Sequence, residues 1–195
     1  MSHEANGLTP GLFLDRDGVI NHNDGYVCRI EDFRFVDGIM DLCRCARGLG
    51  FDLIVVTNQS GLARGLYQEA DVVSLHTWML SQFGNEGVRI RAIYYSPYHP
   101  EGTVERYRRE SSCRKPGAGM LVQASSEHGI DLARSVMVGD KITDLRAAHA
   151  AGLPRAYWLC ERELLTQAPQ LDGCEVVIAA SLSDVEQDLA RRITI

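Results

Sequence analysis

No stretch of this sequence is apolar over the roughly 18–20 residues that a membrane-spanning helix needs, although 45% of all residues are hydrophobic. Its first ten residues, MSHEANGLTP, also lack the basic and apolar regions of a secretory signal peptide. Together these absences predict a protein that works in the cytoplasm and has no membrane partner.

Positive charge is scarce as well. The chain has 20 Lys and Arg against 26 Asp and Glu, for a formal net charge of −6. A domain that binds nucleic acid usually carries a basic face, so we expect no nucleic-acid partner. An anionic substrate remains compatible with this balance, because a local basic pocket can override the overall sign.

Cysteine is limited to six positions in 195 residues. A chain of this length buries enough core to fold without disulfide bonds, and a reducing cytosol keeps thiols free. We therefore predict free thiols and one domain that spans residues 1–195. Cys43 and Cys45 fall within a helical pattern, which suits packing better than metal binding.

Short apolar runs alternate with helical patterns along the chain. Strands are predicted at Leu12–Leu14, Phe51–Thr57, Ile90–Tyr95, Ser135–Val138, Ala156–Leu159 and Glu175–Ile178. Helices are predicted at Ile39–Leu49 with Asp37 as its cap, Val72–Phe83, Gly117–His128, Ile142–Ala148 and Leu182–Arg191. This alternation predicts a parallel sheet covered on both faces, with ligands beyond the carboxyl ends of its strands. Residues 96–113 show no period, and we expect an ordered loop beside the active site.

Two acidic residues, Asp15 and Asp17, follow the first predicted strand in the segment LDRDGVIN. Alternate side chains of an extended segment point the same way, so the two carboxylates would repel each other unless a cation is shared. Oxygen ligands of this kind favour Mg²⁺. The glycine stands too early for an EF-hand loop, which leaves a magnesium site or a solvated turn.

Three other polar segments stand at strand or helix ends. The segment TNQSG, residues 57–61, provides a hydroxyl, amides and backbone N–H groups for phosphoryl oxygens, or caps the next helix. Arg114 and Lys115 precede a predicted helix, where cations and the helix dipole attract anions, although basic turns are common. In the segment VGDKITD, Asp140 and Asp144 share one helical face, or Asp140 caps the helix.

In combination the four segments are more specific than each alone. An acid pair, a hydroxyl, a lysine and a further acid occur in this order along the predicted sheet. They could supply a nucleophile, a metal site, a charge clamp and an acid–base group. Positioning and charge neutralisation provide most of the catalysis of phosphoryl transfer, so the set predicts that reaction.

With these motifs the sequence resembles the haloacid dehalogenase-like (HAD-like) phosphatases, and most of all the D,D-heptose 1,7-bisphosphate phosphatases and their histidinol-phosphate phosphatase relatives. The resemblance extends from about Leu12 to Val177, on the strings FLDRDGVIN, DGYV, TNQSGLARG, YHPEG, CRKPGAGM and MVGDKITDLRAA. It implies a Rossmann-like α/β three-layer sandwich with a parallel sheet. It also implies no large cap domain, because little chain separates the first two motifs.

The resemblance implies a role for each matching catalytic residue. Asp15 would attack phosphorus and become transiently phosphorylated, and Asp17 would protonate the leaving alkoxide and then activate water. Thr57 and Lys115 would hold the transferring phosphoryl group. Mg²⁺ would be bound by Asp15, by Asp17 through its backbone carbonyl, and by Asp140.

Further residues receive supporting roles from the same resemblance. Asp144 would orient Lys115 or a metal-bound water. The substrate site would be lined by Asn23, Asp24, Gly25, Tyr26, Asn58, Gln59, Ser60, Arg114 and Lys141. The remaining histidines, His76 among them, receive no functional role and are expected on the surface or in packing.

The sequence departs from the resembled pattern in the long loop. Many relatives hold a structural zinc there through Cys-x-His and Cys-x-Cys, but the corresponding positions here are Ser96, Tyr98, Ser111 and Cys113. Only Cys113 is a good zinc ligand, so we predict no structural zinc, with a weak site at His99 and Cys113 as the alternative. Packing of Tyr98, or pairing of the loop's arginines with its glutamates, would then order the loop. A solvated charged face is the favoured interpretation of those charges, which belong to Glu101, Glu105, Arg106, Arg108, Arg109 and Glu110.

The favoured function is removal of the C7 phosphate from D-glycero-D-manno-heptose 1,7-bisphosphate by a monomeric enzyme of lipopolysaccharide or capsule biosynthesis, with Arg114 reading the far end of the sugar. Histidinol-phosphate phosphatase is the alternative, because it shares the motifs. A receiver-type phospho-acceptor domain belongs to a different class, and it is disfavoured because the third strand ends in YSP without an aspartate. A catalytically inactive relative is disfavoured because every core catalytic position is present.

Overall fold

Six parallel strands form one sheet in the computed structural model, which describes residues 7–160 and 168–193. The strands are β1 (Thr9–Leu14), β2 (Asp52–Asn58), β3 (Ile90–Ser96), β4 (Ile130–Gly139), β5 (Arg155–Leu159) and β6 (Glu175–Ala179). Their order across the sheet is β3-β2-β1-β4-β5-β6, and every neighbouring pair is parallel. All six predicted strands are confirmed, and β1 and β4 begin earlier than predicted.

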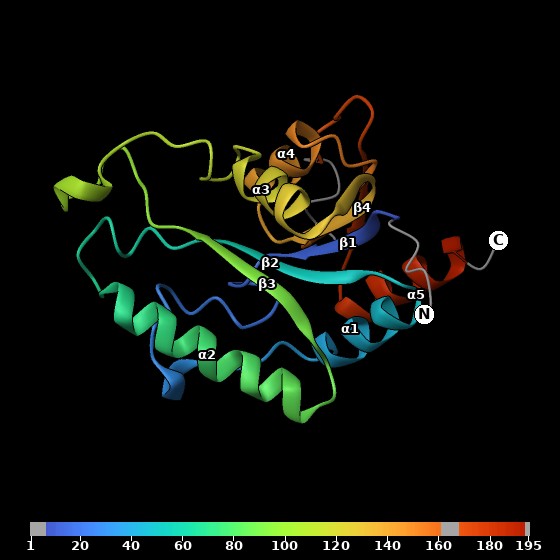
Figure 1. Ribbon diagram of the computed structural model, residues 1–195, viewed down its shortest axis with the longest axis horizontal. Coiled ribbons are helices and arrows are strands. Elements are labelled where there is room, and N and C mark those ends of the chain that lie inside the picture. The colour runs from blue at the N-terminus through green and yellow to red at the C-terminus, as the bar shows by residue number, and fades with distance from the viewer. Residues whose placement is uncertain (1–6, 161–167, 194–195) are drawn as a thin grey trace, which may run out of the picture.

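Helices cover both faces of this sheet (Figure 1). On one side lie α1 (Ile39–Gly48), α2 (Glu69–Asn85) and α5 (Leu182–Ile193). On the other side lie α3 (Gly119–His128) and α4 (Ile142–Ala150). Two short 3-10 turns complete the described elements, η1 (Ile30–Asp32) and η2 (Glu105–Tyr107). The predicted Rossmann-like three-layer α/β architecture is therefore confirmed.

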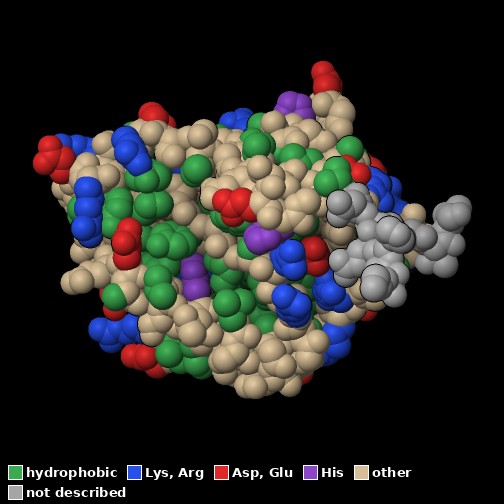
Figure 2. All heavy atoms as spheres, in the orientation of Figure 1, with side chains coloured by type: hydrophobic (Ala, Val, Ile, Leu, Met, Phe, Trp, Pro, Cys, Tyr) green, Lys and Arg blue, Asp and Glu red, His purple; other side chains and the backbone are tan. Residues whose placement is uncertain are grey.

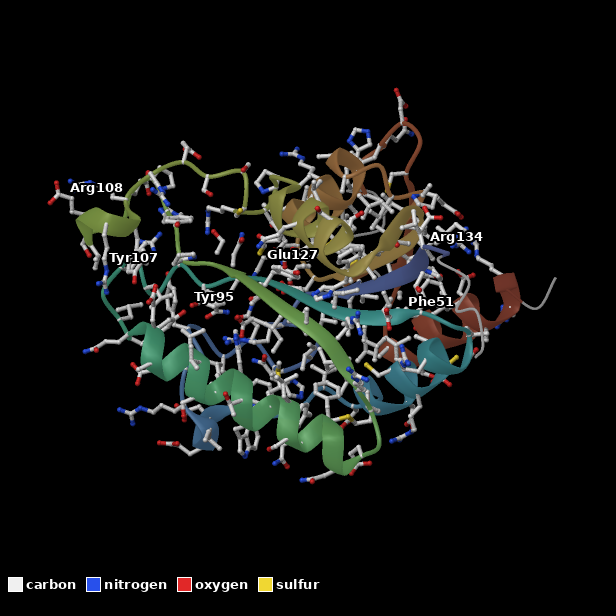
Figure 3. All side chains as sticks on the ribbon, in the orientation of Figure 1. Phe51, Tyr95, Tyr107, Arg108, Glu127 and Arg134 are labelled. Atoms are coloured by element: carbon white, nitrogen blue, oxygen red, sulfur yellow. The ribbon has the colours of Figure 1, made fainter. Side chains whose placement is uncertain are left out.

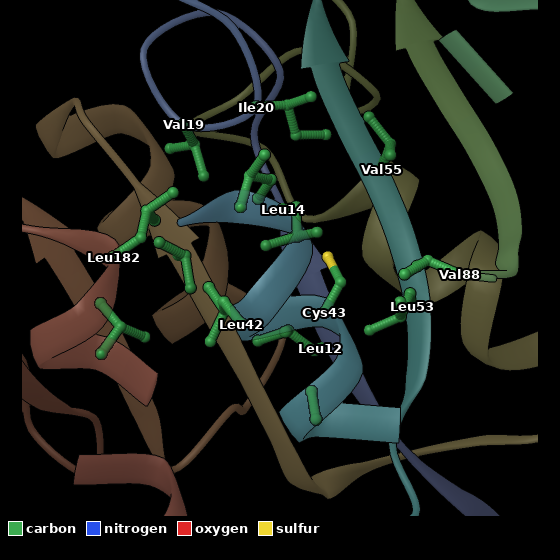
Figure 4. Packing of buried hydrophobic residues seen from close by; sticks show 14 of the residues in the cluster. Leu12, Leu14, Val19, Ile20, Leu42, Cys43, Leu53, Val55, Val88 and Leu182 are labelled. Carbon is green, nitrogen blue, oxygen red and sulfur yellow. The ribbon is translucent and has the colours of Figure 1, made fainter. Parts of the chain in front are cut away.

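The alternation of side chains along β1 serves two separate hydrophobic cores. Leu12 and Leu14 pack on the side of α1, α2 and α5 (Figure 4), whereas Phe13 packs on the side of α3 and α4. All three side chains are fully buried. Burying one such side chain stabilises the fold by about 1.5–3 kcal/mol. A continuous apolar run is therefore what a central strand of this sheet requires, and β1 is central.

The cap of α1 and the start of α3 differ from the predicted ones. Gly38, at φ 86°, is the N-cap of α1, so Asp37 does not cap that helix as predicted. A left-handed φ of this kind favours glycine over residues with a Cβ. Helix α3 begins at Gly119, because a tight turn comes first in which the Gly119 N–H donates to the Ser112 carbonyl over 2.8 Å. A Cβ at Gly117 would collide with the same carbonyl.

Two expectations from composition can be compared with the fold. Within residues 7–160 and 168–193, no helix has both the length and the apolar character needed to cross a membrane. No disulfide bond joins the six cysteines, all of which lie in the described residues.

Residues 97–113, here called the outer loop, connect β3 to the turn before α3 and extend from the carboxyl edge of the sheet (Figure 1). Tyr107 points from this loop toward the start of α2 (Figure 3), where its hydroxyl donates to Oε1 of Glu69 over 2.8 Å. The rings of Tyr98 and Tyr107 lie 6.4 Å apart, and the Arg109 guanidinium lies 4.0 Å from the centre of the Tyr98 ring. The predicted packing of Tyr98 is therefore present.

Charged side chains of both signs cover the outside of the same loop (Figure 2). They include five exposed residues, Glu105, Arg106, Arg108, Arg109 and Glu110. Across the described part of the chain, no ion pair joins the loop's arginines to its glutamates. The aromatic contacts, rather than the predicted charge pairs, thus connect the loop to the rest of the fold.

Candidate active site

The centre of the site is a buried lysine between two carboxylates. Nζ of Lys115 lies 2.8 Å from Oδ1 of Asp15 and 2.7 Å from Oδ1 of Asp144. Asp15 follows β1, Lys115 comes from the turn before α3, and Asp144 from the first turn of α4. Isolated buried charges are unfavourable by several kcal/mol each, so a lysine here needs such close partners. The carboxyl ends of a parallel sheet bring these distant segments together.

Burial and charge oppose each other in this cluster. Burial raises the pKa of Asp15 to about 7, even though Lys115 pulls it down. For Lys115, burial on its own favours the neutral amine, but the negative charges of Asp144 and Asp15 outweigh it and raise the pKa. Lys115 therefore keeps its positive charge, while Asp15 is the group whose charge changes near neutral pH.

Three carboxylates at this point could hold one cation. Asp15, Asp140 and Asp144 offer oxygens that all lie within 4.8 Å of one another. Oδ1 of Asp140 is buried and has no hydrogen-bond partner, and a Cβ at Gly18 would collide with the carboxylate of Asp140. An unsatisfied buried carboxylate oxygen beside a second carboxylate fits a hard cation such as Mg²⁺. Asp15 and Asp144 both pair with Lys115, whereas Oδ1 of Asp140 has neither an ion-pair nor a hydrogen-bond partner among the described residues, so Asp140 offers the freest oxygen to a cation.

The side chain of Asp17 has different partners from those expected. Nη2 of the fully buried Arg16 lies 2.9 Å from Oδ1 and 3.0 Å from Oδ2 of Asp17. Asn21 donates to Oδ1 over 3.1 Å, and Gln59 donates to Oδ2 over 3.0 Å. The acid pair was expected to be neutralised by a shared cation, but Arg16 compensates Asp17. Only the backbone carbonyl of Asp17 is thus compatible with the predicted magnesium site.

A cavity of about 330 Å³ opens above these groups. Its lining consists of Asp15, Asp17, Tyr26, Asn58, Ser60, Arg64, His99, Arg114, Lys115, Lys141, Thr143 and Asp144. The cavity is therefore lined by Asp15, by Lys115 and by several of the predicted substrate residues. Arg64, Arg114 and Lys141 make its rim cationic, which favours an anionic ligand in spite of the negative net charge.

Some predicted substrate residues line a neighbouring hollow. Asp24 forms an exposed ion pair of 2.6 Å with Arg34, and together with Gly25 it lines a hollow that shares Tyr26 with the cavity. Asn23 is exposed and is absent from the cavity lining. Of the DGYV string only Tyr26 lines the cavity.

The TNQSG segment divides between supporting contacts and the cavity. Gln59 is buried, and its amide donates to Asp17 and, over 2.9 Å, to Oγ1 of Thr57. Asn58 exchanges two hydrogen bonds of 3.0 Å with the backbone of Lys115. Gln59 was predicted to contact substrate, but its amide is already bonded within the protein. Asn58 lines the cavity and also fixes the turn that carries Lys115.

The basic pair Arg114 and Lys115 separates in the structure. Lys115 points into the buried cluster, whereas Arg114 is half-buried, lines the cavity and donates from Nη1 to the Tyr98 carbonyl over 3.2 Å. Helix α3 begins only at Gly119. The pair therefore lies in the turn before α3, as expected, although the helix begins later than the predicted Gly117.

Some residues of the site were not identified from the sequence. Arg64, His99 and Thr143 line the cavity, and Arg16 and His76 lie in the buried network beneath it. The sequence contained a signal for Arg16 and for His76. Arg16 follows a buried strand between two acids, where an arginine must find partners. His76 lies one turn after Val72 and three residues before Met79, on the apolar face of α2.

Comparisons with known proteins give consistent relatives. Residues 112–182 match the family model described as HAD-hydrolase-like. The D-glycero-beta-D-manno-heptose-1,7-bisphosphate 7-phosphatase of Escherichia coli K12 is 42% identical over 183 residues, which cover 94% of this chain and 95% of that protein. The D-glycero-alpha-D-manno-heptose-1,7-bisphosphate 7-phosphatase of Burkholderia mallei is 47% identical over 152 residues, which cover 78% and 80%.

A solved structure resembles the whole fold. The D,D-heptose 1,7-bisphosphate phosphatase of B. bronchiseptica, determined in complex with magnesium and phosphate, aligns with a TM-score of 0.79 and 29% identity. The alignment covers 93% of this chain and 99% of that protein.

Proposed function

Since this chain belongs to the heptose-1,7-bisphosphate 7-phosphatases among the HAD-like hydrolases, we propose that it removes the C7 phosphate of D-glycero-D-manno-heptose 1,7-bisphosphate. The observation that carries the proposal is the buried Lys115 between Asp15 and Asp144, with Asp140 beside them, under a cationic cavity. These groups are what transfer of a phosphoryl dianion requires.

The chemistry is assigned to two carboxylates. Asp15 attacks phosphorus, so that a bond forms between its carboxylate oxygen and phosphorus while the bond from phosphorus to O7 breaks. Asp17 gives its proton to the departing O7. Asp17 then takes a proton from a water molecule that attacks the phosphorylated Asp15, and phosphate and free Asp15 result.

The remaining polar groups hold the phosphoryl oxygens. Lys115 and Thr57 are proposed to bind them, and Asp144 keeps Lys115 charged and in place. Oδ1 of Asp15 accepts a hydrogen bond from Lys115 and another from the backbone N–H of Arg16 over 2.7 Å. These two contacts orient the carboxylate. Magnesium held by Asp15, Asp140 and the Asp17 carbonyl would neutralise charge on the transferring group.

The rim favours a bisphosphate over histidinol phosphate. Arg64 and His99 lie 3.3 Å apart, and Arg114 and Lys141 line the same cavity. A second phosphate would be attracted by the positive charges of Arg64, Arg114 and Lys141. The amino group of histidinol phosphate would instead be repelled by them. The heptose bisphosphate is therefore favoured, and Arg114 is proposed to read its distal phosphate.

Phosphate release from both anomers of the heptose 1,7-bisphosphate, compared with histidinol phosphate, tests the proposal. We expect a higher kcat/KM for the bisphosphate, and ³¹P NMR should show that the C7 signal is lost first. Arg114→Gln should raise KM for the bisphosphate but not for a sugar monophosphate, with Arg108→Gln as the matched control. A clear preference for histidinol phosphate would overturn the substrate assignment. A lasting phosphoprotein without turnover would support a receiver-type function instead.

The outer loop is proposed to hold no structural zinc. At the four positions concerned, Ser96 is buried at the end of β3, Tyr98 lies under Arg109, and Oγ of Ser111 accepts the Cys113 N–H over 3.2 Å. These contacts give Tyr98 and Ser111 structural roles without metal, whereas the buried Oγ of Ser96 has no hydrogen-bond partner among the described residues. Elemental analysis of purified protein should find no stoichiometric zinc, whereas one zinc per chain would refute the proposal.

The cellular setting is proposed on the same basis. We infer a cytoplasmic monomer in which residues 1–195 form one HAD-like phosphatase domain. Light scattering coupled to gel filtration should give a mass near 21.6 kDa, and a stable mass of twice that value would contradict the monomer.

A further inference from the structure

Arg16 is a fully buried arginine whose guanidinium group makes polar contacts along two of its edges. Along one edge, Nε and Nη2 donate to Oδ1 of Asp17 over 3.2 and 2.9 Å, and Nη2 also lies 2.7 Å from the Val27 carbonyl. At the other edge, Nη1 lies 3.1 Å from Nε2 of His76. The guanidinium therefore lies between the catalytic acid and helix α2, which carries His76.

The chemistry of the two groups determines how His76 takes part. A guanidinium has only hydrogen-bond donors, so Nε2 of His76 must accept, and the imidazole is neutral with its proton on Nδ1. Burial and the positive charge of Arg16 lower the pKa of His76 to about 3. His76 is consequently a permanent acceptor for Arg16 at any pH at which the enzyme would work.

This contact restrains the position of the Asp17 carboxyl. A guanidinium is planar, so fixing Nη1 also fixes the direction in which Nε and Nη2 point. On the opposite side of Asp17, Gln59 donates to Oδ2, and the Tyr67 hydroxyl donates to Oε1 of Gln59 over 2.7 Å, which sets the orientation of that amide. Asp17 is thus held by Arg16 and Gln59, and each of these side chains is held in place by a further residue.

We propose that His76 is a positioning residue that acts through Arg16 to place Asp17 where it exchanges protons with the leaving oxygen and with water. Packing alone would need an apolar ring at this position and no acceptor nitrogen. The proposal rests on the proposed two-step phosphatase mechanism, in which Asp17 is the acid and then the base. It adds a residue of α2 that touches neither substrate nor phosphorus.

The test compares two leaving groups in excess Mg²⁺. The alkoxide of a sugar phosphate needs a proton from Asp17 to depart, whereas p-nitrophenyl phosphate releases a phenolate that needs little help. His76→Phe keeps the ring volume and removes the acceptor. His76→Gln keeps an acceptor oxygen near the position of Nε2. Leu75→Val, at a buried position of the hydrophobic core in the same helix, controls for damaged packing.

We expect His76→Phe to lower kcat/KM for the heptose bisphosphate about 10- to 100-fold and to change kcat/KM for p-nitrophenyl phosphate by less than about threefold. The same variant should accumulate phosphorylated enzyme with p-nitrophenyl phosphate, visible by intact-mass measurement, because the second step also needs Asp17. His76→Gln should recover most of the loss. If His76→Phe does not fold, His76→Asn replaces it, since its amide is too short to reach Arg16.

Equal losses on both substrates, or no loss on either, would overturn the positioning role. Equal losses in Leu75→Val and His76→Phe would do so too. Failure of the proposed function looks different: the wild-type enzyme would turn over neither substrate, or Asp15→Asn would remain active. The two failures are therefore distinguishable in one set of assays.

Discussion

The charged cluster (Asp15, Lys115, Asp140 and Asp144) and the outer loop both contribute residues to the same cavity, but different forces hold them in place. The cluster consists of buried charges that compensate each other, and removing one partner of such a pair typically destabilises a protein by about 3–5 kcal/mol. The loop is held by aromatic packing and by Arg109 above Tyr98, a contact of the kind that contributes about 0.5–1 kcal/mol at exposed sites.

The difference explains why one region matches the resembled pattern and the other does not. Loss of Lys115 would leave both Asp15 and Asp144 buried without their positively charged partner. The loop needs only to present His99 to the cavity, and several kinds of contact can do that. An aromatic residue, Tyr98, can therefore stand where relatives are expected to have a zinc ligand, without any change in the chemistry below.

The largest expected effect comes from the nucleophile. Asp15→Asn should lower turnover by more than about 10³-fold, because an amide cannot form the phosphorylated intermediate. Phosphate release measures the loss, and thermal unfolding shows whether the fold survives. Turnover above a tenth of the wild-type rate would remove Asp15 from the mechanism and break the distinction between the two regions.

The next effect concerns the acid–base residue. Asp17→Asn should lower turnover about 10²-fold or more, because the leaving alkoxide then departs without a proton. Asparagine keeps part of the hydrogen bonding to Arg16, so the loss should be in kcat more than in KM. Steady-state kinetics on the bisphosphate check this, and near-normal kcat would contradict the role of Asp17.

A smaller effect is expected from pH on magnesium binding. Burial raises the pKa of Asp15 to about 7, and Mg²⁺ must displace the proton that this pKa retains. Protonation is favoured as the pH falls, so affinity should be about tenfold weaker at pH 6 than at pH 8. Calorimetric titration at the two pH values measures it, and an affinity independent of pH would show that Asp15 is not a ligand.

The smallest effect belongs to the outer loop. Arg109→Ala should speed amide hydrogen exchange in residues 97–110 by about two- to fivefold, which corresponds to the loss of one cation–π contact. Turnover of p-nitrophenyl phosphate should stay within about twofold, because the cluster does not depend on Arg109. Arg108→Ala is the matched control, since its exposed side chain carries the same charge in the same loop. If a zinc chelator accelerated exchange as much, metal and not aromatic packing would order the loop.

Much of the fold and of the cluster could be predicted from local pattern. The order of strands and helices followed from apolar runs and helical periods, because burial on both faces of a parallel sheet leaves that signature. The proximity of Asp15, Lys115 and Asp140 followed from the rule that parallel strands end at one edge. The Gly38 cap of α1 and the start of α3 at Gly119 were missed, since one depends on a left-handed backbone and the other on a close approach to Ser112.

The residue types by themselves determined which chemistry this protein can perform: a nucleophilic carboxylate, a lysine and further acids at the ends of buried strands. Only the tertiary structure decided which charged side chains pair with each other. Arg16 contacts Asp17 and His76, and His76 is 60 positions away in the sequence. Lys115 pairs with Asp15 and Asp144, and Asp15 is 100 positions away. Partners this far apart leave no local periodicity, because their contact is created by the packing of helices against the sheet.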